Sequence, residues 1–497
     1  MMRHDDDSNS PAYLSVRELR ALLKGGELSA VELLESLICR IEELDGPINA
    51  VVVRDFERAR TAARLADDMR RRGDDRPLLG IPMTVKESFN VAGLPTTWGF
   101  PAARDFVADD DAAAVERLKG AGAIIIGKTN IPVAISDWQS FNPIYGTTNN
   151  PWDLSRSPGG SSGGSAAALA AGFVPLELGS DLRGSLRVPA HYCGVYGHKP
   201  THGIIPLRGH VPPGAEALPT TRDLAVAGPL ARCAEDLGSA LEVLAGPDDP
   251  EREGFSLNLP AARHKRLRDF RILVLKTHPL IATSTATVGA LTRFVDQLMH
   301  AGVSVSDDHT LVPDLERTAV VYTKLFMSLI AAYWPAEVYD RIKTTIAAAP
   351  AHIDGARIRR GRAAVLSHRD WILADQVRAS LRKSWHAVFR QFDVVLCPTM
   401  PTPALAHDHL PDQEERRISI DGVEMSYEDQ DPWLSIASLS GLPSTVAPIG
   451  RSSSGLPIGV QIIGPYLGDR TTIAFADLIE REFGGFSPPR LGSRSTA

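Results

Sequence analysis

The feature that constrains this chain most is a stretch of small residues between two loops of glycine and serine. It reads GGSSGGSAAALAAGFVPLELGSDLRGSLRVPA over residues 159–190. The segment AAALAAG predicts a helix that ends at Gly172, and the apolar run FVPLEL predicts a strand after it. Each loop therefore offers serine hydroxyls on a backbone that glycine leaves free to turn.

The rest of the chain alternates apolar strands with amphipathic helices. Strands in LLGIPMTVKE and AIIIGKTN flank a helix at residues 113–121, and strands in FRILVLK and VSVSD flank a helix at 285–301. Such alternation predicts an α/β layer architecture with a largely parallel or mixed sheet. Residues 315–390 are rich in helix signals, so we expect a helical cap there.

Charge and cysteine content exclude several classes of partner. The chain carries 53 Lys and Arg against 60 Asp and Glu, scattered along its length, so we expect no nucleic-acid partner. No run of about 18 apolar residues occurs, so we expect no membrane partner. The four cysteines have neither CxxC nor Cys/His spacing, which predicts no metal site and no disulfide framework. They are Cys39, Cys193, Cys233 and Cys397.

The N-terminus predicts a location. The opening MMRHDDDSNSPAY lacks the apolar core of a signal peptide, so we expect a cytoplasmic protein whose residues 1–12 are flexible.

Lys86 is a candidate general base. It follows the apolar run 79–85, so its amine is expected to be buried, and burial favours the uncharged form that accepts a proton. The alternative is a lysine whose stem is buried while its ammonium group reaches solvent. The segment alone leaves both interpretations open.

The first loop, residues 159–165, precedes the predicted helix. Backbone N–H groups at a helix N-terminus bind anions and orient hydroxyls. A P-loop is excluded because no Gly-Lys-Ser/Thr closes the loop. The pattern G-x-S-x-G occurs twice, with Ser161 or Ser162 in the centre, but NNPWDLSRSP precedes it where a nucleophile elbow needs a buried strand. A flexible linker remains the alternative.

The second loop places Ser185 after the predicted strand. Backbone N–H groups at such a turn converge on an oxyanion, which makes Ser185 the candidate nucleophile. The alternative is a serine that only caps the next helix.

Several longer segments resemble the amidase signature family. They are GIPMTVKESFNVAG, GKTN, YGTTNNPWDLSRSPGGSSGGSAAALAAG, GSDLRGSLRVPAHYCGVYGHKPT, GPLAR, FDVVLCPTMPTPA and GLPIGVQIIGP, and together they span roughly residues 14 to 485. The resemblance implies a single large α/β domain over residues 13–490, with its signature core at about 75–240. In that fold a central, mixed, twisted sheet is covered by helices on both faces.

The resemblance also implies the site. The family uses a Ser, cis-Ser, Lys triad, and the separations of 75 and 24 residues between the three positions agree with it. The triad positions are Lys86, Ser161 as the cis-serine and Ser185 as the nucleophile. An oxyanion hole is implied at the backbone of Leu182, Arg183, Gly184 and Ser185, with supporting roles for Ser162 and Asp181. Separately, aromatic residues in loops near the motifs predict a substrate pocket for bulky apolar groups at Trp138, Tyr145 and Trp433. The alternative is that these aromatics fill the core.

Arg183 departs from the family pattern, which usually has two glycines before the nucleophile. If residue 183 needs a positive φ, a non-glycine residue costs about 1–2 kcal/mol. Otherwise the guanidinium is expected at the site mouth, where it would hold a carboxylate or carbonyl of the substrate.

The function implied is hydrolysis of a C–N bond in a small-molecule amide, anilide or carbamate, without cofactor or metal. A homodimer is left open. Two alternatives remain: the A subunit of a tRNA-dependent amidotransferase, and a non-catalytic binding protein on the same scaffold.

Overall fold

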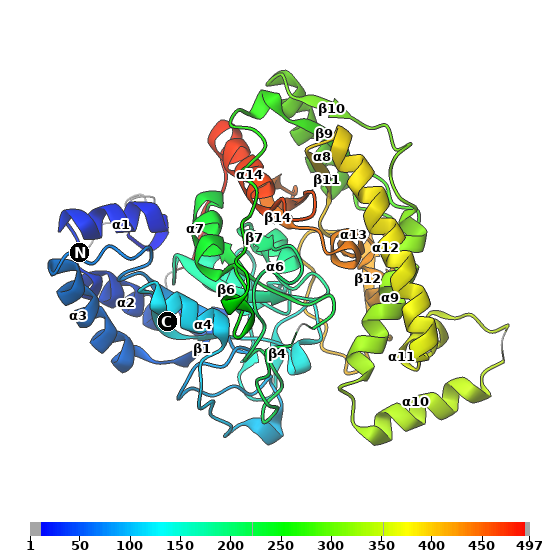
Figure 1. Ribbon diagram of the computed structural model, residues 1–497, viewed down its shortest axis with the longest axis horizontal. Helices are drawn as coiled ribbons and strands as arrows, with labels where there is room; N and C mark the ends of the chain where they lie inside the picture. The colour runs from blue at the N-terminus through cyan, green and yellow to red at the C-terminus, as the bar shows by residue number, and fades with distance from the viewer. Residues whose placement is uncertain (1–10, 221, 351, 493–497) are drawn as a thin grey trace.

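A mixed sheet of eleven strands forms the centre of the molecule (Figure 1). The computed structural model describes residues 11–220, 222–350 and 352–492. In sheet order the strands are β1 (Val51–Arg54), β3 (Ile124–Thr129), β2 (Pro82–Lys86), β6 (Leu176–Asp181), β8 (Val226–Ala231), β7 (Tyr196–Lys199), β14 (Ser444–Arg451), β15 (Pro457–Ile463), β11 (Val394–Pro398), β9 (Arg271–Val274) and β10 (Ser304–Ser306).

Parallel pairing in one half of this sheet matters most for the site. β2 runs parallel to both β3 and β6, and Val85 pairs with Leu178. The carboxyl ends of β2 and β6 therefore meet at one edge of the sheet, where α/β proteins place their ligands. The next neighbour, β8, is antiparallel to β6.

Helices cover both faces of the sheet (Figure 1). One group, α5 and α6, packs on β6, β8, β14 and β15, while α7 and α14 contact one another and β7, β8 and β14. The helices before the cap are α1 (Val16–Gly25), α2 (Ala30–Ile48), α3 (Phe56–Arg71), α4 (Ala113–Gly120), α5 (Gly163–Ala170), α6 (Arg187–Cys193), α7 (Ala234–Leu244) and α8 (Thr285–His300). After the cap come α13 (Pro432–Ser440) and α14 (Asp469–Phe483).

The expected helical cap is present. It consists of α9 (Leu315–Ala331), α10 (Ala336–Ala348), α11 (Ala356–Ala364) and α12 (His368–Gln391), on the side opposite α1 to α3 in Figure 1. α9 contacts α11, α12 and α13, so the cap is tied to the helix that follows β11 in the chain.

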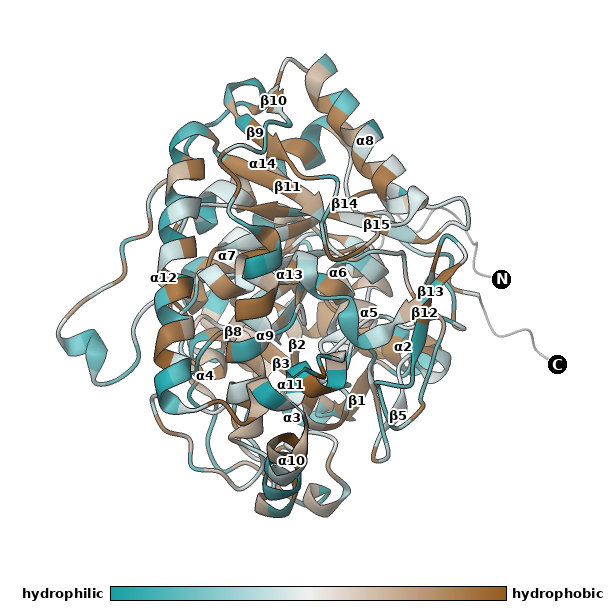
Figure 2. Ribbon diagram, turned by 90° about the vertical axis from the view of Figure 1, so that its right-hand side faces the viewer, coloured by the Kyte–Doolittle hydropathy of each residue, from teal (hydrophilic) through white to brown (hydrophobic). Residues whose placement is uncertain are grey.

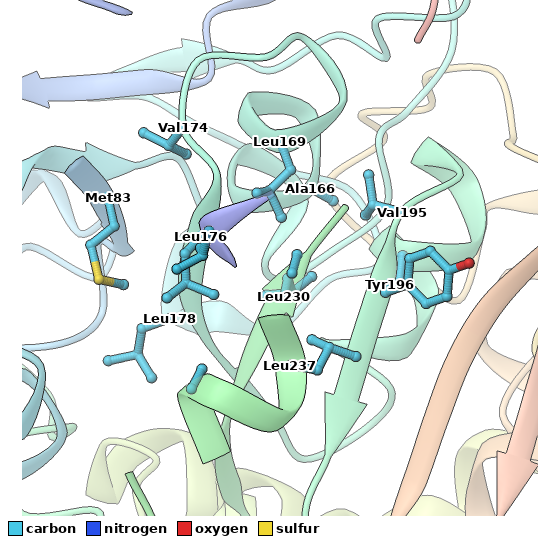
Figure 3. Packing of buried hydrophobic residues seen from close by; sticks show 14 of the residues in the cluster. Met83, Ala166, Leu169, Val174, Leu176, Leu178, Val195, Tyr196, Leu230 and Leu237 are labelled. Atoms are coloured by element: carbon cyan, nitrogen blue, oxygen red, sulfur yellow. The ribbon is translucent and has the colours of Figure 1, made fainter. Parts of the chain in front are cut away.

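The core centres on the small-residue helix. Every residue of α5 is buried, and alanine side chains let it approach the sheet closely. Figure 3 shows Ala166 and Leu169 of α5 near Leu176 and Leu230 of two neighbouring strands. In Figure 2 apolar colour concentrates on the inner strands, whereas α12 carries mixed colours. Within the described ranges, no helix has the length and apolar character needed to cross a bilayer.

Local signals explain much of this architecture. Ser29 caps α2 with a capping box in which its Oγ accepts from the Glu32 amide, an arrangement typical of a serine three residues before a glutamate. Three strands of the central sheet escaped prediction: β8 contains Gly228 and Pro229, which weaken a strand signal, and β1 and β7 are each only four residues long. A separate hairpin of β12 (Arg417–Ile420) and β13 (Val423–Ser426) was also missed.

The expected flexible N-terminus needs one correction. Residues Pro11–Tyr13 form a 3-10 turn in which Ala12 is buried. Residues 1–10 lie outside the described part of the chain. The bounds 13 and 490 for a single domain remain our proposal, supported by a sheet whose strands come from both halves of the chain.

Candidate active site

The structure brings Lys86, Ser161 and Ser185 together. Lys86 Nζ lies 2.7 Å from Ser161 Oγ, and Ser161 Oγ lies 2.9 Å from Ser185 Oγ. Lys86 and Ser161 are buried, whereas Ser185 retains 8% of its exposure. The three groups form a chain of contacts from a buried amine to a hydroxyl that a substrate is able to reach.

Three different elements supply these side chains. Lys86 is the last residue of β2, and Ser185 follows the end of β6 by four residues. Ser161 lies just before α5, and the peptide bond between Gly160 and Ser161 is cis. Since β2 and β6 are parallel neighbours, their carboxyl ends deliver Lys86 and the Ser185 loop to the same place.

Burial sets the charge of Lys86. It lowers the pKa of the amine to about 7, although the negative charge of Asp181 acts in the opposite direction. Lys86 Nζ also lies 3.0 Å from Ser180 Oγ. About half of the amine is therefore uncharged at neutral pH, and it has two hydroxyl partners.

Asp181 organises the backbone before Ser185. Its carboxylate accepts hydrogen bonds from the amides of Gly184 and Leu186 and forms a fully buried ion pair with Arg187. Burial alone would raise the pKa of Asp181, but the Arg187 charge and its hydrogen bonds bring that pKa below its usual range. Ser162 supports the same loop, since its amide donates to the carbonyl of Ser185.

The loop at residues 182–185 is fixed by side chains on both sides. Tyr322 of α9 donates its hydroxyl to the Leu182 carbonyl, and Trp138 Nε1 donates to the Arg183 carbonyl. The Gly184 amide already donates to Asp181 Oδ1 at 2.8 Å. Of the four amides expected in the oxyanion hole, that of Gly184 therefore has another partner, and this part of the expectation is corrected.

Arg183 also differs from expectation. Its backbone lies outside the left-handed region, which Gly184 occupies with φ of 89°. Its guanidinium binds carboxylates of the protein itself, with Nε 2.6 Å from Asp431 and Nη1 2.9 Å from Glu428. The same group lies over the Trp138 ring at 4.2 Å. Arg183 is thus a clamp that holds the loop at residues 182–185 through Asp431 and Glu428, and its guanidinium is not available for a substrate carboxylate.

A cavity of about 390 Å³ opens beside Ser161 and Ser185. This volume lies within the range of small-molecule sites. Trp138 lines the cavity, as expected, and so do residues of the cap that the sequence did not point to. The apolar lining residues from α9 and the segment after it are Phe326, Leu329, Ile330, Tyr333, Trp334 and Pro335.

The other two expected pocket residues lie elsewhere. Trp433 is fully buried in a separate cluster and donates its indole N–H to Thr283 Oγ1. Tyr145 is not among the lining residues, because its hydroxyl lies beside Thr97 and Glu87. Both aromatics serve packing instead of the cavity wall.

A match to the family model described as Amidase extends over residues 32–473. The chain belongs to the amidase family. One relative is the A subunit of the glutamyl-tRNA(Gln) amidotransferase from Roseiflexus castenholzii. Its sequence is 34% identical to this one, over 95% of this chain and 96% of the relative. The indoleacetamide hydrolase of Bradyrhizobium diazoefficiens is 33% identical over 94% of this chain and 86% of that protein.

A solved structure shows the same fold. A bacterial aryl acylamidase of the amidase signature family superposes with a TM-score of 0.78 at 25% identity, covering 96% of this amidase and 97% of that chain. This amidase is accordingly a hydrolase of carbon–nitrogen bonds other than peptide bonds, and its substrates are small amides.

Sequence reasoning missed two polar residues of the site. Ser180 precedes Asp181 on β6 and contacts Lys86, and its place in the GSD motif was the available signal. His210 lines the cavity and shares a 3.0 Å hydrogen bond with Ser88. No local pattern marks His210, which reaches the cavity from a loop 25 residues beyond Ser185. Within the described ranges, no group of three or more His, Cys, Asp or Glu side chains is arranged to hold a metal ion.

Proposed function

We propose that this amidase cleaves its substrates through an acyl-enzyme on Ser185. The observation that carries the proposal is the contact chain from Lys86 Nζ through Ser161 Oγ to Ser185 Oγ. An alcohol is a weak nucleophile at neutral pH and needs a neighbouring base. Lys86 is that base because burial lowers the pKa of its amine to about 7, so a large share of it is uncharged at neutral pH.

The acylation step first moves a proton from Ser185 toward Lys86 and then returns one to the leaving group. As Ser185 Oγ attacks the substrate carbonyl carbon, its proton passes to Ser161 while the Ser161 proton passes to Lys86. When the C–N bond breaks, Lys86 returns a proton through Ser161 to the leaving nitrogen. The products of this step are a free amine and an ester on Ser185.

The second step regenerates the enzyme. Water attacks the ester carbonyl and gives a proton through the same relay to Lys86. The bond between the acyl carbon and Ser185 Oγ then breaks, and Ser185 recovers its proton. The acid and the unmodified enzyme are left.

The backbone amides of Leu182, Arg183 and Ser185 are proposed to stabilise the oxyanion. Hydrogen bonds to the Leu182 and Arg183 carbonyls fix the peptide planes of this loop before substrate arrives. Donors that are positioned in advance contribute about 3–4 kcal/mol each to barrier reduction in acyl transfer.

The cavity indicates the size and polarity of the substrate. Its wall combines aliphatic and aromatic side chains from α9 with Trp98, Phe100 and Trp138. We therefore propose an amide, anilide or carbamate with a bulky apolar group. Hydrolases named for indoleacetamide and for aryl acylamides are among the relatives of this chain.

One experiment tests the nucleophile directly. The protein is treated with a fluorophosphonate and digested, and the labelled peptide is identified by mass spectrometry; 4-nitroanilides of graded acyl size are then assayed. We expect label on Ser185 and release of 4-nitroaniline. Label on Ser161 or Ser162 would overturn the assignment, and an unlabelled, inactive protein would favour a binding function.

The A subunit of a tRNA-dependent amidotransferase is the second candidate. It is favoured by the 34% identity to such a protein from Roseiflexus castenholzii. Against it, the segment after the nucleophile, GHKPTHGIIPLRGHVPPG, differs from the form we associate with amidotransferases of that kind. Glutaminase activity that appears only when partner subunits are added would establish this candidate in place of the first.

We also propose a cytoplasmic location. The four cysteines are free, a state that the reducing cytoplasm maintains. Cell fractionation tests the location, and recovery outside the cytoplasmic fraction would refute it. A homodimer also remains a prediction, and light scattering on the purified protein would test it.

A further inference from the structure

The cavity beside Ser185 is lined by four charged side chains, three of which have partners within the protein. Asp181 pairs with Arg187, and Arg183 pairs with Asp431 and Glu428. Asp137 pairs with Arg416 at 2.6 Å. The fourth charged side chain is Arg222.

Arg222 has no such partner. Throughout residues 11–220, 222–350 and 352–492, no carboxylate or other acceptor bonds to its guanidinium. The group instead lies over two rings, with its central carbon 5.3 Å from the Tyr333 centroid and 6.0 Å from that of Trp98. Tyr333 follows α9 in the cap and Trp98 belongs to the loop after β2, so Arg222 stands where cap and core face each other.

Contacts with aromatic rings hold an arginine without using up its hydrogen-bonding capacity. A guanidinium that stacks on rings keeps N–H donors in its plane for a carboxylate. Arg222 is also partly buried, which strengthens a charge-assisted hydrogen bond relative to one in water.

The charge of Arg222 extends into the cavity. His210, on the cavity wall, has a pKa well below its usual value, first because it is buried and second because of the positive charge of Arg222. His210 is therefore neutral and brings no compensating charge of its own.

We propose that Arg222 binds a carboxylate of the substrate, so that preferred substrates are apolar amides carrying a carboxylate away from the scissile bond. This inference rests on the proposed function, because the proposed function is what makes the ligand a substrate. The apolar wall receives the body of such a molecule, Ser185 receives the amide carbonyl, and Arg222 binds the charged end. The role that the sequence suggested for Arg183 thus passes to Arg222.

The test measures binding without turnover. Binding to the Ser185→Ala protein is measured by calorimetry. The acids tested are the mono-4-nitroanilides of succinic, glutaric, adipic and pimelic acids and the benzamide of 4-aminobenzoic acid. Each acid is compared with an analogue of equal length in which a methyl ketone replaces the carboxylate. We expect at least one acid to bind tenfold or more tightly than its ketone. Arg222→Met should remove that preference and leave the affinity for the ketone within about threefold, whereas Arg222→Lys should retain part of it.

A matched control separates binding from general charge effects. Arg341 is exposed on α10 and is not among the residues that line the cavity. Arg341→Met should therefore keep the preference for the acid. Equal or undetectable binding of every acid, or a preference that survives Arg222→Met, overturns the inference. Because binding needs no turnover, failure of fluorophosphonate labelling at Ser185 overturns the proposed function separately.

Discussion

Lys86 Nζ and Ser161 Oγ lie 2.7 Å apart where neither side chain is open to water, with exposed fractions of 0% and 1%. A charged ammonium at this place would lose its hydration, so the fold itself favours the neutral amine. The hydroxyl next to that amine is the one that also contacts Ser185. Through the contact between Lys86 and Ser161, the burial of the amine therefore affects the reactivity of Ser185.

The rate should depend on pH through Lys86. The amine acts as a base only when unprotonated, and burial lowers its pKa to about 7. We expect kcat/KM to fall about tenfold for each pH unit well below 7 and to level off above it. A profile that is flat between pH 6 and 9 would contradict the assignment.

A carboxyl variant provides the control for that profile. Burial raises the pKa of Glu177 to about 8, so this group is largely uncharged in the range where Lys86 titrates. Glu177→Gln should therefore preserve the acidic limb, measured with the same 4-nitroanilide.

Two serines that both contact Lys86 should differ in importance. Ser161 and Ser180 lie 2.7 and 3.0 Å from Lys86 Nζ, but Ser161 alone of these two bridges to Ser185. Ser161→Ala should lower kcat by about 10²–10⁴, because it interrupts proton transfer. Ser180→Ala should cost far less. Single-turnover kinetics and fluorophosphonate labelling rates measure both, and equal losses would argue against a relay through Ser161.

Local periodicity was sufficient to predict most of the layers. The apolar runs around Lys86 and at residues 123–130 became β2 and β3, and the helix expected at 285–301 is α8. β8 was missed because Gly228 and Pro229 interrupt its apolar pattern, although pairing with β6 and β7 makes it a central strand. Tertiary pairing outweighs the weak local signal there.

The residues of the candidate site also fall into two groups: those that local motifs identify and those that only the tertiary structure brings to the site. Motifs located Lys86, Ser161 and Ser185 because each belongs to a long, specific segment. The partners of Arg183 lie 245 and 248 residues away, and no local pattern connects them. The cavity wall from α9 is also far from Ser185 in the sequence, so sequence spacing gave no reason to place Phe326 beside it.

Arg183 should contribute to both stability and turnover. Its side chain is 18% exposed, and the partners Glu428 and Asp431 are 12% and 14% exposed. Arg183→Met would leave two largely buried carboxylates unpaired, which we expect to lower the free energy of unfolding by roughly 1–3 kcal/mol, less than for fully buried pairs. It should also lower kcat, because the loop before Ser185 loses its anchor. Urea titration and steady-state kinetics provide the two measurements.

A surface pair serves as the reference for that variant. Arg357 and Asp412 are 66% and 41% exposed. Arg357→Met should change the free energy of unfolding by less than about 1 kcal/mol and leave kcat unaltered. If both variants behaved alike, the clamp would have no special role.

Two glycines with nearly the same backbone should respond differently to alanine. Gly184 has φ of 89° and Gly203 has φ of 87°, so a side chain at either costs roughly 1–2 kcal/mol in conformational strain. At Gly184 a Cβ would also lie 2.5 Å from Leu434 Cδ1, whereas at Gly203 it would meet no atom within 4 Å among the described residues. Gly184→Ala should therefore displace the loop that carries Ser185 and reduce kcat/KM strongly, while Gly203→Ala should lower only the urea midpoint. Full activity of Gly184→Ala would show that the loop tolerates displacement and that its backbone amides are not held for the oxyanion.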